Sequence, residues 1–381
     1  MERFSPVLPL QSRSQKRSEP IMGPDPTWSG MKWLRMNSMW RMRIDSRYSV
    51  LRPSQTLRLY ENGEAFIVAP RILWLGTLPK PSEGPVIVTG ASSGLGRAIC
   101  ELLASKRRDV YAGVRKQKDS AELAKLPNVT PLVLDVTNSE DVRRGAKTVR
   151  ESGRGLHGLV NSAGVTGLGP LIDTSVEEFN RVLEVNLVGI HRMIHDFGPL
   201  LVESKGRIVN ISSIGGFMTD TWLGPYGTSK HALEGYTEIL REELAMLGLS
   251  VSTIEPMAYR SRMAINAWEL LRGEADTKWE RSAFRDQIKQ VWNWYVNTPG
   301  VLERTIYPEP TPVAEAVYDA LYSDSPKPRY LVSDRDTATE VIDNILARLI
   351  QVNGGQTDPL TDSELAARLR KALDERATKG R

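Results

Sequence analysis

From residue 85 onward, short apolar runs alternate with longer segments in which apolar residues recur every three or four positions. The short runs are typical of strands buried on both faces, and the longer segments are typical of amphipathic helices. Because strands and helices alternate, we expect an α/β fold with a doubly wound parallel sheet. The predicted strands are Val86–Thr89, Val110–Val114, Val129–Leu134, Leu156–Val160, Gly206–Ile211 and Ser250–Glu255.

Helices are predicted between these strands and after the last of them. They cover Arg97–Ser105, Ser139–Ser152, Ser175–Ser204, Gly224–Met246, Thr311–Tyr322 and Asp336–Val352, with an edge strand at Arg329–Val332. An amphipathic stretch near Leu365–Leu373 lies in a polar tail. We therefore divide the chain into an extension of residues 1–82, a domain of residues 83–345 and a polar helical tail of residues 346–381.

Residues 257–310 interrupt this alternation and are rich in tryptophan. The segment follows the sixth strand, so we expect a helical lid over an apolar pocket. The alternative is an aromatic packing layer that touches no ligand. The tryptophans concerned are Trp268, Trp279, Trp292 and Trp294.

The basic residues are concentrated in the extension. Residues 1–82 hold 13 Lys and Arg against 6 Asp and Glu, although the whole chain carries a net charge of only +4. The predicted domain therefore lacks the charge signature of a nucleic-acid partner. We expect the extension to be disordered or loosely packed. The alternatives are a targeting segment, a folded accessory element, or a basic amphipathic helix over Met31–Arg47 that contacts a membrane surface.

The rest of the composition indicates a soluble protein of a reducing compartment. No apolar run reaches the ~18 residues that a membrane-spanning helix needs. The single cysteine, Cys100, excludes an internal disulfide framework and is expected to pack on a helix face. These features favour a cytoplasmic or organellar location over secretion.

A glycine-rich turn follows the first predicted strand and precedes a helix. Strand, glycine turn and helix in this order are typical of a dinucleotide-binding site. Glycine permits the tight turn and the close approach of the backbone to a pyrophosphate, and the helix start favours negative charge. The residues assigned to this site are Thr89, Gly90, Ser92, Ser93, Gly94, Leu95 and Gly96.

The second strand ends in basic residues. An acid that binds the ribose hydroxyls is expected about 20 residues after the glycines. This chain has Arg115 and Lys116 near that place, which suits a 2′-phosphate. We therefore expect NADP(H), with NAD(H) as the alternative. For the basic residues, the alternative interpretation is a solvated loop.

Tyr226 and Lys230 lie four residues apart on a predicted helix, so they share one face. A phenol ordinarily titrates near pH ~10. A neighbouring ammonium favours the phenolate, so we expect Lys230 to lower the pKa of Tyr226 and make it a general acid or base.

Other chemically suggestive residues follow the ends of further strands. Asp135 follows the third strand, Asn161–Gly164 the fourth and Ser212–Ser213 the fifth. Ligands of doubly wound sheets bind beyond the carboxyl ends of the strands. We therefore expect one site at that edge.

Together these motifs resemble the compact branch of the short-chain dehydrogenase/reductase family, over roughly residues 83–335. The segments near Val110–Gly113 and Ser229–Tyr236 resemble the subgroup that acts on retinoids, hydroxysteroids and 3-hydroxybutyrate. The resemblance implies a Rossmann-type fold and a catalytic set of Asn186, Ser213, Tyr226 and Lys230.

The resemblance also implies a role for each residue. Tyr226 would exchange the proton, Ser213 would bind the substrate oxygen, and Lys230 would also bind the nicotinamide ribose. Asn186 would hold a water that links Lys230 to solvent. Asp135 would bind the adenine amino group, and the floor of the cofactor site would include Val136, Asn161, Ala163 and Gly164.

The sequence departs from the family pattern at three places. Ser162 replaces an asparagine, and Met257 replaces the usual glycine after Pro256. The threonine often found shortly after is not evident, and Ser261 is the candidate substitute. Met257 puts the carried-over cofactor and substrate preferences in question.

We therefore expect an NAD(P)-dependent oxidoreductase that interconverts a carbonyl and an alcohol on a fairly apolar small molecule. The alternative is a catalytically silent dinucleotide-binding scaffold or sensor. Relatives of this kind are commonly dimers or tetramers. No metal site is expected, because His191 and His195 are spaced as ligands often are but lack a third partner.

Overall fold

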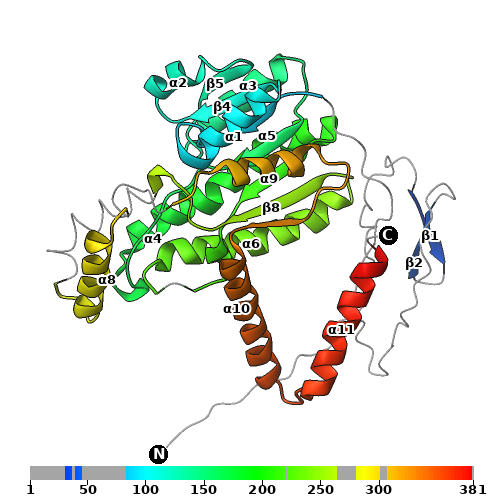
Figure 1. Ribbon diagram of the computed structural model, residues 1–381. Helices are drawn as coiled ribbons and strands as arrows, with labels where there is room; N and C mark the ends of the chain where they lie inside the picture. Colours follow the sequence, from blue (N-terminus) through cyan, green and yellow to red (C-terminus); the bar gives the residue numbers. More distant parts are fainter. Residues whose placement is uncertain are drawn as a thin grey trace, which may run out of the picture. The chain divides into compact units, whose positions relative to one another are not determined.

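The computed structural model describes Met31–Met36, Met39–Ile44 and residues 83–219, 221–263, 280–300 and 307–379. The chain forms two compact units, Met1–Leu73 and Trp74–Arg381, each of which is considered by itself (Figure 1). The expectations for residues 1–30 and 45–82 lie outside the described residues.

The first unit contains a β-hairpin. Strands β1 (Met31–Met36) and β2 (Met39–Ile44) pair antiparallel, with Trp33 opposite Met42. The alternative of an amphipathic helix over Met31–Arg47 is therefore wrong for these residues. Only two residues separate the paired Met36 and Met39, which is the connection length typical of a hairpin.

The second unit is built on a parallel sheet of seven strands in the order β5-β4-β3-β6-β7-β8-β9 (Figure 1). The predicted doubly wound sheet is confirmed, including the edge strand β9, which pairs with β8. The boundary at β6 differs from the prediction by two residues at its start. The strands are β3 (Val86–Val88), β4 (Val110–Val114), β5 (Val129–Val133), β6 (Gly158–Asn161), β7 (Arg207–Ile211), β8 (Ser250–Pro256) and β9 (Arg329–Val332).

Helices cover both faces of this sheet because consecutive strand residues point to opposite sides. Val86 and Val88 pack on one side, with helices α1 (Gly94–Ser105) and α9 (Thr311–Tyr322). Ile87 packs on the other side, with α3 (Ser139–Glu151), α5 (Gly189–Ser204) and α6 (Gly224–Ala245). Figure 1 shows α1 and α9 on the same face. Both layers fix the strand ends where the motifs lie.

The predicted helix Ser175–Ser204 is interrupted. It consists of α4 (Val176–Leu183), a π-helical segment (Glu184–Val188) and α5. Single π-turns inserted in helices are frequent at functional sites, and Asn186 lies in this one. A short helix that the sequence did not predict, α2 (Gln117–Leu123), follows the basic residues after β4.

Besides α9, three helices follow β8 among the described residues. Helix α8 (Arg285–Asn297) lies in the predicted lid, and α10 (Arg335–Gly354) and α11 (Asp362–Lys379) follow β9. Trp268 and Trp279 lie outside the described residues. None of the helices in the described part of the chain is long and apolar enough to cross a membrane.

Candidate functional site

The glycine turn between β3 and α1 has the geometry that the motif predicts. Gly90 and Gly94 adopt positive φ angles of 69° and 57°, which favour glycine. A Cβ atom on Gly96 would lie 2.4 Å from the carbonyl oxygen of Gly90. The backbone of α1 therefore begins directly against the turn, and its first N–H groups form a cradle that suits a phosphate.

Thr89 supports this cradle from beneath. Its side chain is buried, and its hydroxyl accepts hydrogen bonds from the backbone N–H groups of Ser162 and Ala163, both 3.0 Å long. A Cβ atom on Gly90 would lie 2.8 Å from Cα of Ala163. The glycine turn and the segment after β6 thus pack directly against each other, and the buried Thr89 joins them through its hydrogen bonds.

Ser92 and Arg115 follow the ends of the neighbouring strands β3 and β4. The backbone N–H of Ala91 donates to the carbonyl of Gly113 over 3.0 Å, which brings the two loops together. Both side chains are exposed, and no hydrogen bond or ion pair holds Arg115 within the described residues. Arg115 is thus available for a phosphate ligand.

Asp135 lies just after β5 and is partly buried. One of its carboxylate oxygens accepts from both the N–H and the hydroxyl of Thr137, at 2.9 and 2.8 Å. This local turn fixes the carboxyl group, and the neighbouring Val136 is buried. Both residues lie at the predicted edge of the sheet.

Asn161 anchors the end of β6 to the next strand. Its amide donates to the Asn210 side chain on β7 over 2.8 Å, and Asn210 donates to Thr237 on α6 over 3.0 Å. The Oδ1 atom of Asn161 is buried and has no partner among the described residues. A buried acceptor of this kind requires a donor.

Asn186 is fully buried, and the described contacts engage both ends of its amide. It accepts from the N–H of Val165 over 2.8 Å and donates to the carbonyl of Val165 and to Ser229 on α6, each over 2.9 Å. Any water held at this position, as the family resemblance implies, is therefore expected to bind the main chain of Asn186 rather than its side chain.

Ser213, Tyr226 and Lys230 meet where β7 ends and α6 begins. Lys230 is buried, and its ammonium donates to the carbonyl of Ile211 over 2.8 Å. The same ammonium lies 5.6 Å from the centre of the Tyr226 ring. Ser213 begins the short helix η3 (Ile214–Gly216), and its hydroxyl accepts from the N–H of Gly215 over 3.1 Å.

Burial dominates the titration of this group. It raises the pKa of Tyr226, and a hydrogen bond with Ser213 opposes that rise. Burial also lowers the pKa of Lys230 to about 8, while Glu234 raises it. The prediction that Lys230 lowers the pKa of Tyr226 is therefore not met in the protein alone, because spacing along a helix reveals charge proximity and not desolvation.

Helix α8 packs against loops that flank this group. Trp292 and Ile288 form a cluster with Leu168, Trp222 and Leu223, which belong to the loops before α6 and after β6. Ser282 ties the start of this segment to Asp173 through a 2.6 Å hydrogen bond. Trp294, in contrast, is 60% exposed. One side of α8 therefore covers loops that flank Tyr226, as a lid requires.

The two departures from the family pattern after β8 have different surroundings. Met257 is partly buried against the core beneath α1 and α9. Ser261 lies over the glycine turn, with its Cβ atom 2.9 Å from the position of a Cβ on Gly94. Ser261 is thus placed beside the cradle, as its correspondence to the family threonine implies.

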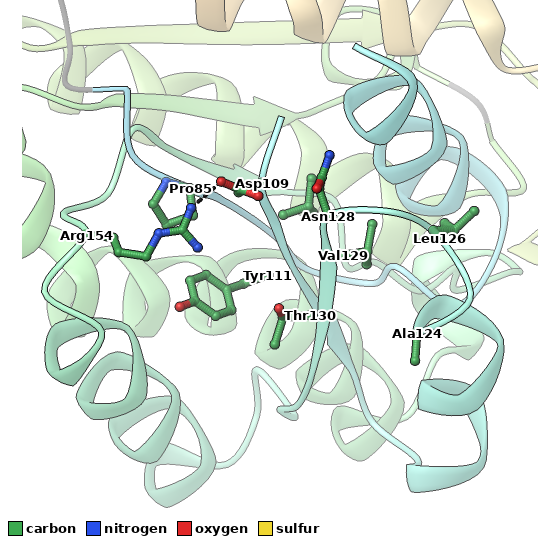
Figure 2. Close-up of a pocket in the computed structure, with 10 residues that line it drawn as sticks. Pro85, Asp109, Tyr111, Ala124, Leu126, Asn128, Val129, Thr130 and Arg154 are labelled. Carbon is green, nitrogen blue, oxygen red and sulfur yellow. Dashed lines mark hydrogen bonds and ion pairs between the residues drawn. The ribbon is translucent and has the colours of Figure 1, made fainter. Parts of the chain in front are cut away.

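A pocket of about 330 Å³ lies at the opposite edge of the sheet and holds none of the predicted site residues. Figure 2 shows Tyr111, Asn128 and the ion pair of Asp109 with Arg154 among the side chains that line it. It lies at the amino ends of β3 to β5. The predicted site residues lie at the carboxyl ends.

Sequence patterns missed the supporting residues. Ser229 and Thr237 join α6 to Asn186 and Asn210, yet both look like ordinary helix residues in the sequence. Their hydroxyls interrupt the otherwise apolar buried side of α6. This interruption is the feature of the sequence that could have identified them. His191, one of the two spaced histidines, contacts the Tyr236 hydroxyl at 3.0 Å.

Several known proteins are similar in sequence to this chain. The sequence model of the family described as short chain dehydrogenase matches residues 85–270. D-beta-hydroxybutyrate dehydrogenase, mitochondrial, of Rattus norvegicus is 36% identical over 205 residues, which cover 51% of this chain and 60% of that protein. The Bos taurus protein of the same name is 31% identical, with 70% and 81% covered. Retinol dehydrogenase 5 of Mus musculus is 32% identical, with 68% and 84% covered.

Solved structures show the same fold. A short chain dehydrogenase/reductase from Burkholderia phymatum in complex with NAD is 25% identical, with a TM-score of 0.59 over 74% of this chain and 99% of that one. Actinorhodin polyketide ketoreductase with NADPH is 26% identical, with a TM-score of 0.54 over 65% and 95%.

Proposed function

Because the chain belongs to the short-chain dehydrogenase family, we propose that it is an NAD(P)-dependent oxidoreductase that interconverts a carbonyl and an alcohol on a fairly apolar small molecule. The observation that supports this most is the meeting of Ser213, Tyr226 and Lys230 at the same edge of the sheet as the cradle of Gly90 to Gly96. A proton donor, an oxygen-binding hydroxyl and a cation then share one sheet edge with a phosphate site.

The residues present fit a dinucleotide. The cradle leaves no room for side chains at Gly90 and Gly96 and offers backbone N–H groups to a pyrophosphate. Asp135, Val136 and the floor of Asn161, Ala163 and Gly164 would hold the adenosine half. The bound nicotinamide would supply or accept the hydride.

The protein's own residues would handle the proton and the charge. Ser213 would donate a hydrogen bond to the substrate oxygen, and Tyr226 would give it a proton during reduction or remove one during oxidation. Lys230, fixed by Ile211, would stabilise the phenolate that remains. The raised pKa of Tyr226 keeps the phenol protonated at neutral pH, ready to act as the acid.

We favour NADP(H) over NAD(H), since Arg115 and Ser92 are exposed on two loops that the hydrogen bond from Ala91 to Gly113 joins, where a 2′-phosphate would lie. Arg115→Asp is expected to weaken NADPH affinity at least tenfold, because one charge-assisted contact is lost and a repulsion is added. Lys118→Asp, on the exposed side of α2, is the matched control. Equal NADPH affinity in both variants would contradict this assignment.

The apolar substrate is supported by the residues around Tyr226. Residues 214–225 contain no Lys, Arg or His, and Trp222 and Leu223 pack under α8. A small hydroxy acid would need a cation for its carboxylate. Of the two substrate types named among the relatives, we therefore favour a retinol-like apolar alcohol over 3-hydroxybutyrate.

Turnover of purified protein tests the proposal. NADPH and NADH oxidation would be followed separately against apolar ketones, aldehydes and acetoacetate, beside Tyr226→Phe. We expect NADPH-dependent reduction of an apolar carbonyl and a loss of about 10³-fold in the variant. Equal rates in both proteins would overturn the role of Tyr226. Cofactor binding without turnover in any arm would favour the silent scaffold.

We also infer that copies of the chain associate as a dimer or tetramer. Helix α10 carries a row of exposed apolar side chains, Ile342, Ile345, Leu346, Leu349, Ile350 and Val352. Acidic Asp336, Glu340 and Asp343 accompany this row, so the helix lacks the basic face typical of a membrane surface. A second copy of the chain is therefore the occupant that this row supports.

A further inference from the structure

An ionic cluster centred on Arg329 lies behind the proposed active site. One guanidinium nitrogen of Arg329 on β9 binds both Glu234 of α6 and Glu255 of β8, at 2.5 and 2.6 Å. Its other terminal nitrogen pairs with Glu238, one turn further along α6. The Glu234 and Glu255 side chains are buried, whereas that of Glu238 is 60% exposed. Two buried carboxylates thus share one cation.

The Arg329 cluster touches the turn that carries Ser213. A Cβ atom on Gly216, in η3, would lie 2.8 Å from Cγ of Glu234, so the carboxylate stem packs directly against this turn. The next residue, Phe217, has its ring centre 5.1 Å from the Arg329 guanidinium. Glu234 is therefore packed between Arg329 and the backbone that positions Ser213.

Glu234 also lies one helical turn after Lys230, on the same face of α6. The Lys230 ammonium is buried, and its hydrogen-bond partner is the uncharged carbonyl of Ile211. A buried ammonium needs an opposite charge nearby, because desolvation favours its neutral form. One oxygen of Glu234, Oε1, is buried with no hydrogen-bond partner in the described part of the chain. Its negative charge is not wholly compensated by Arg329.

The other ionisable groups around Glu234 do not supply this charge. Tyr226 is protonated at neutral pH because its pKa is raised by burial. Arg241 on α6 is a cation that binds Thr253 and the carbonyl of Pro328. Burial, together with the neighbouring charge of Glu234, raises the pKa of Glu255 to about 7 although Arg329 lowers it, so Glu255 is partly protonated at neutral pH. Glu234 is the buried carboxylate that raises the pKa of Lys230.

We propose that Glu234, clamped by Arg329, is a positioning residue that provides the counter-charge for Lys230 and supports the turn of Ser213. The inference rests on the proposed oxidoreductase function and extends it to a residue outside the predicted catalytic set. Loss of the anion would let Lys230 lose its proton at a lower pH, and the cation that stabilises the Tyr226 phenolate would be lost with that proton.

The pH profile of kcat tests this for Glu234→Gln against wild type, from about pH 6 to about pH 10. Glu238→Gln is the matched control, since it also contacts Arg329 from α6 but from the exposed side. We expect the alkaline limb of carbonyl reduction to move down by about one pH unit in Glu234→Gln only. A fall in kcat with the limb unmoved would show a merely structural role and overturn the proposal.

A measurement without turnover separates this inference from the proposed function. The pKa of Lys230 is depressed in the folded protein, so the unfolded chain binds more protons above about pH 8 and stability rises with pH there. Urea unfolding should show this rise beginning about one pH unit lower in Glu234→Gln. Lys230→Met in each background identifies the part of the rise that belongs to Lys230.

The two arms decide the two claims independently. A wild-type protein with no turnover, in which the Lys230-dependent rise still shifts in Glu234→Gln, supports Glu234 and counts against the enzyme assignment. An unshifted rise overturns the role of Glu234 whatever the turnover. If Glu234→Gln does not fold, Glu234→Asp and Glu234→Asn can be compared instead. Both side chains are one methylene shorter, and they differ in that Asp carries the negative charge and Asn does not.

Discussion

Helices α6 and α10 are the two long helices of the second unit, with 22 and 20 residues, and they differ in what their inner faces contact. Helix α6 buries polar side chains, among them Ser229, Lys230 and Glu234. Each of these three contacts a residue outside α6: Asn186, Ile211 at the end of β7, and Arg329 on β9, respectively. On α10, Val341 is buried, whereas six large apolar residues are exposed. Apolar periodicity predicts both helices equally well. Buried polar contacts distinguish the helix that carries the site.

The largest effect on turnover predicted from this comparison tests whether these polar contacts align the site. Ser229 donates to the carbonyl of Tyr226 over 2.7 Å and accepts from Asn186. Ser229→Ala should lower kcat about tenfold and the free energy of unfolding by about 1–2 kcal/mol, because the buried Asn186 amide loses an acceptor. Thr228→Ala, which removes only a bond to Gly224 on the same helix, should stay near wild type. Steady-state kinetics and urea unfolding measure both, and equal losses in the two variants would refute the alignment role.

A second prediction concerns the pH dependence that the Arg329 cluster gives to stability. The pKa of Glu255 is raised to about 7 from 4.5, so the folded protein binds more protons between these values. The contribution of Glu255 to the free energy of unfolding should therefore be present below about pH 4.5 and fall by about 3 kcal/mol as pH rises through 7. Glu255→Gln should flatten this part of the profile in urea titrations. A profile as steep as that of wild type would contradict the raised pKa.

A third prediction extends the comparison to α8, which has one packed and one exposed tryptophan. Trp292 joins the cluster under the lid, and Trp294 is 60% exposed. If α8 covers the substrate, Trp292→Ala should change kcat/KM between large and small ketones about tenfold, by removing buried contact area. Trp294→Ala should leave that ratio unchanged. The same ratio in both variants would favour a packing layer.

The smallest effect on the folded subunit is expected on α10. Ile345→Asp combined with Leu349→Asp adds charge to exposed positions, so the stability of the isolated subunit should change little. Association through this row should be lost, because the added carboxylates would be buried without partners. Light scattering after gel filtration measures the mass, with Gln351→Asp as the control. An unchanged oligomer would show that α10 is not the interface.

Much of the fold was predictable because its signals are local. The buried strand runs, the glycines at positive φ and the Tyr226–Lys230 spacing are each contained in a short segment. The parallel order then brings the strand ends to one edge without further information. The hairpin of β1 and β2 was missed, because Trp, Met and Arg in Met31–Arg47 suit a helix as well as a strand.

The sequence by itself determined the sheet, the glycine cradle and the identity of the residues at its edge, because each depends on neighbours a few positions away. Only the tertiary structure decided that Asn186 uses its side chain on Val165, that burial raises the pKa of Tyr226, and that Arg329 reaches Glu234 across 95 residues of sequence. Desolvation and long-range ion pairs depend on what surrounds a group in space, and that surrounding exists only after the chain has folded.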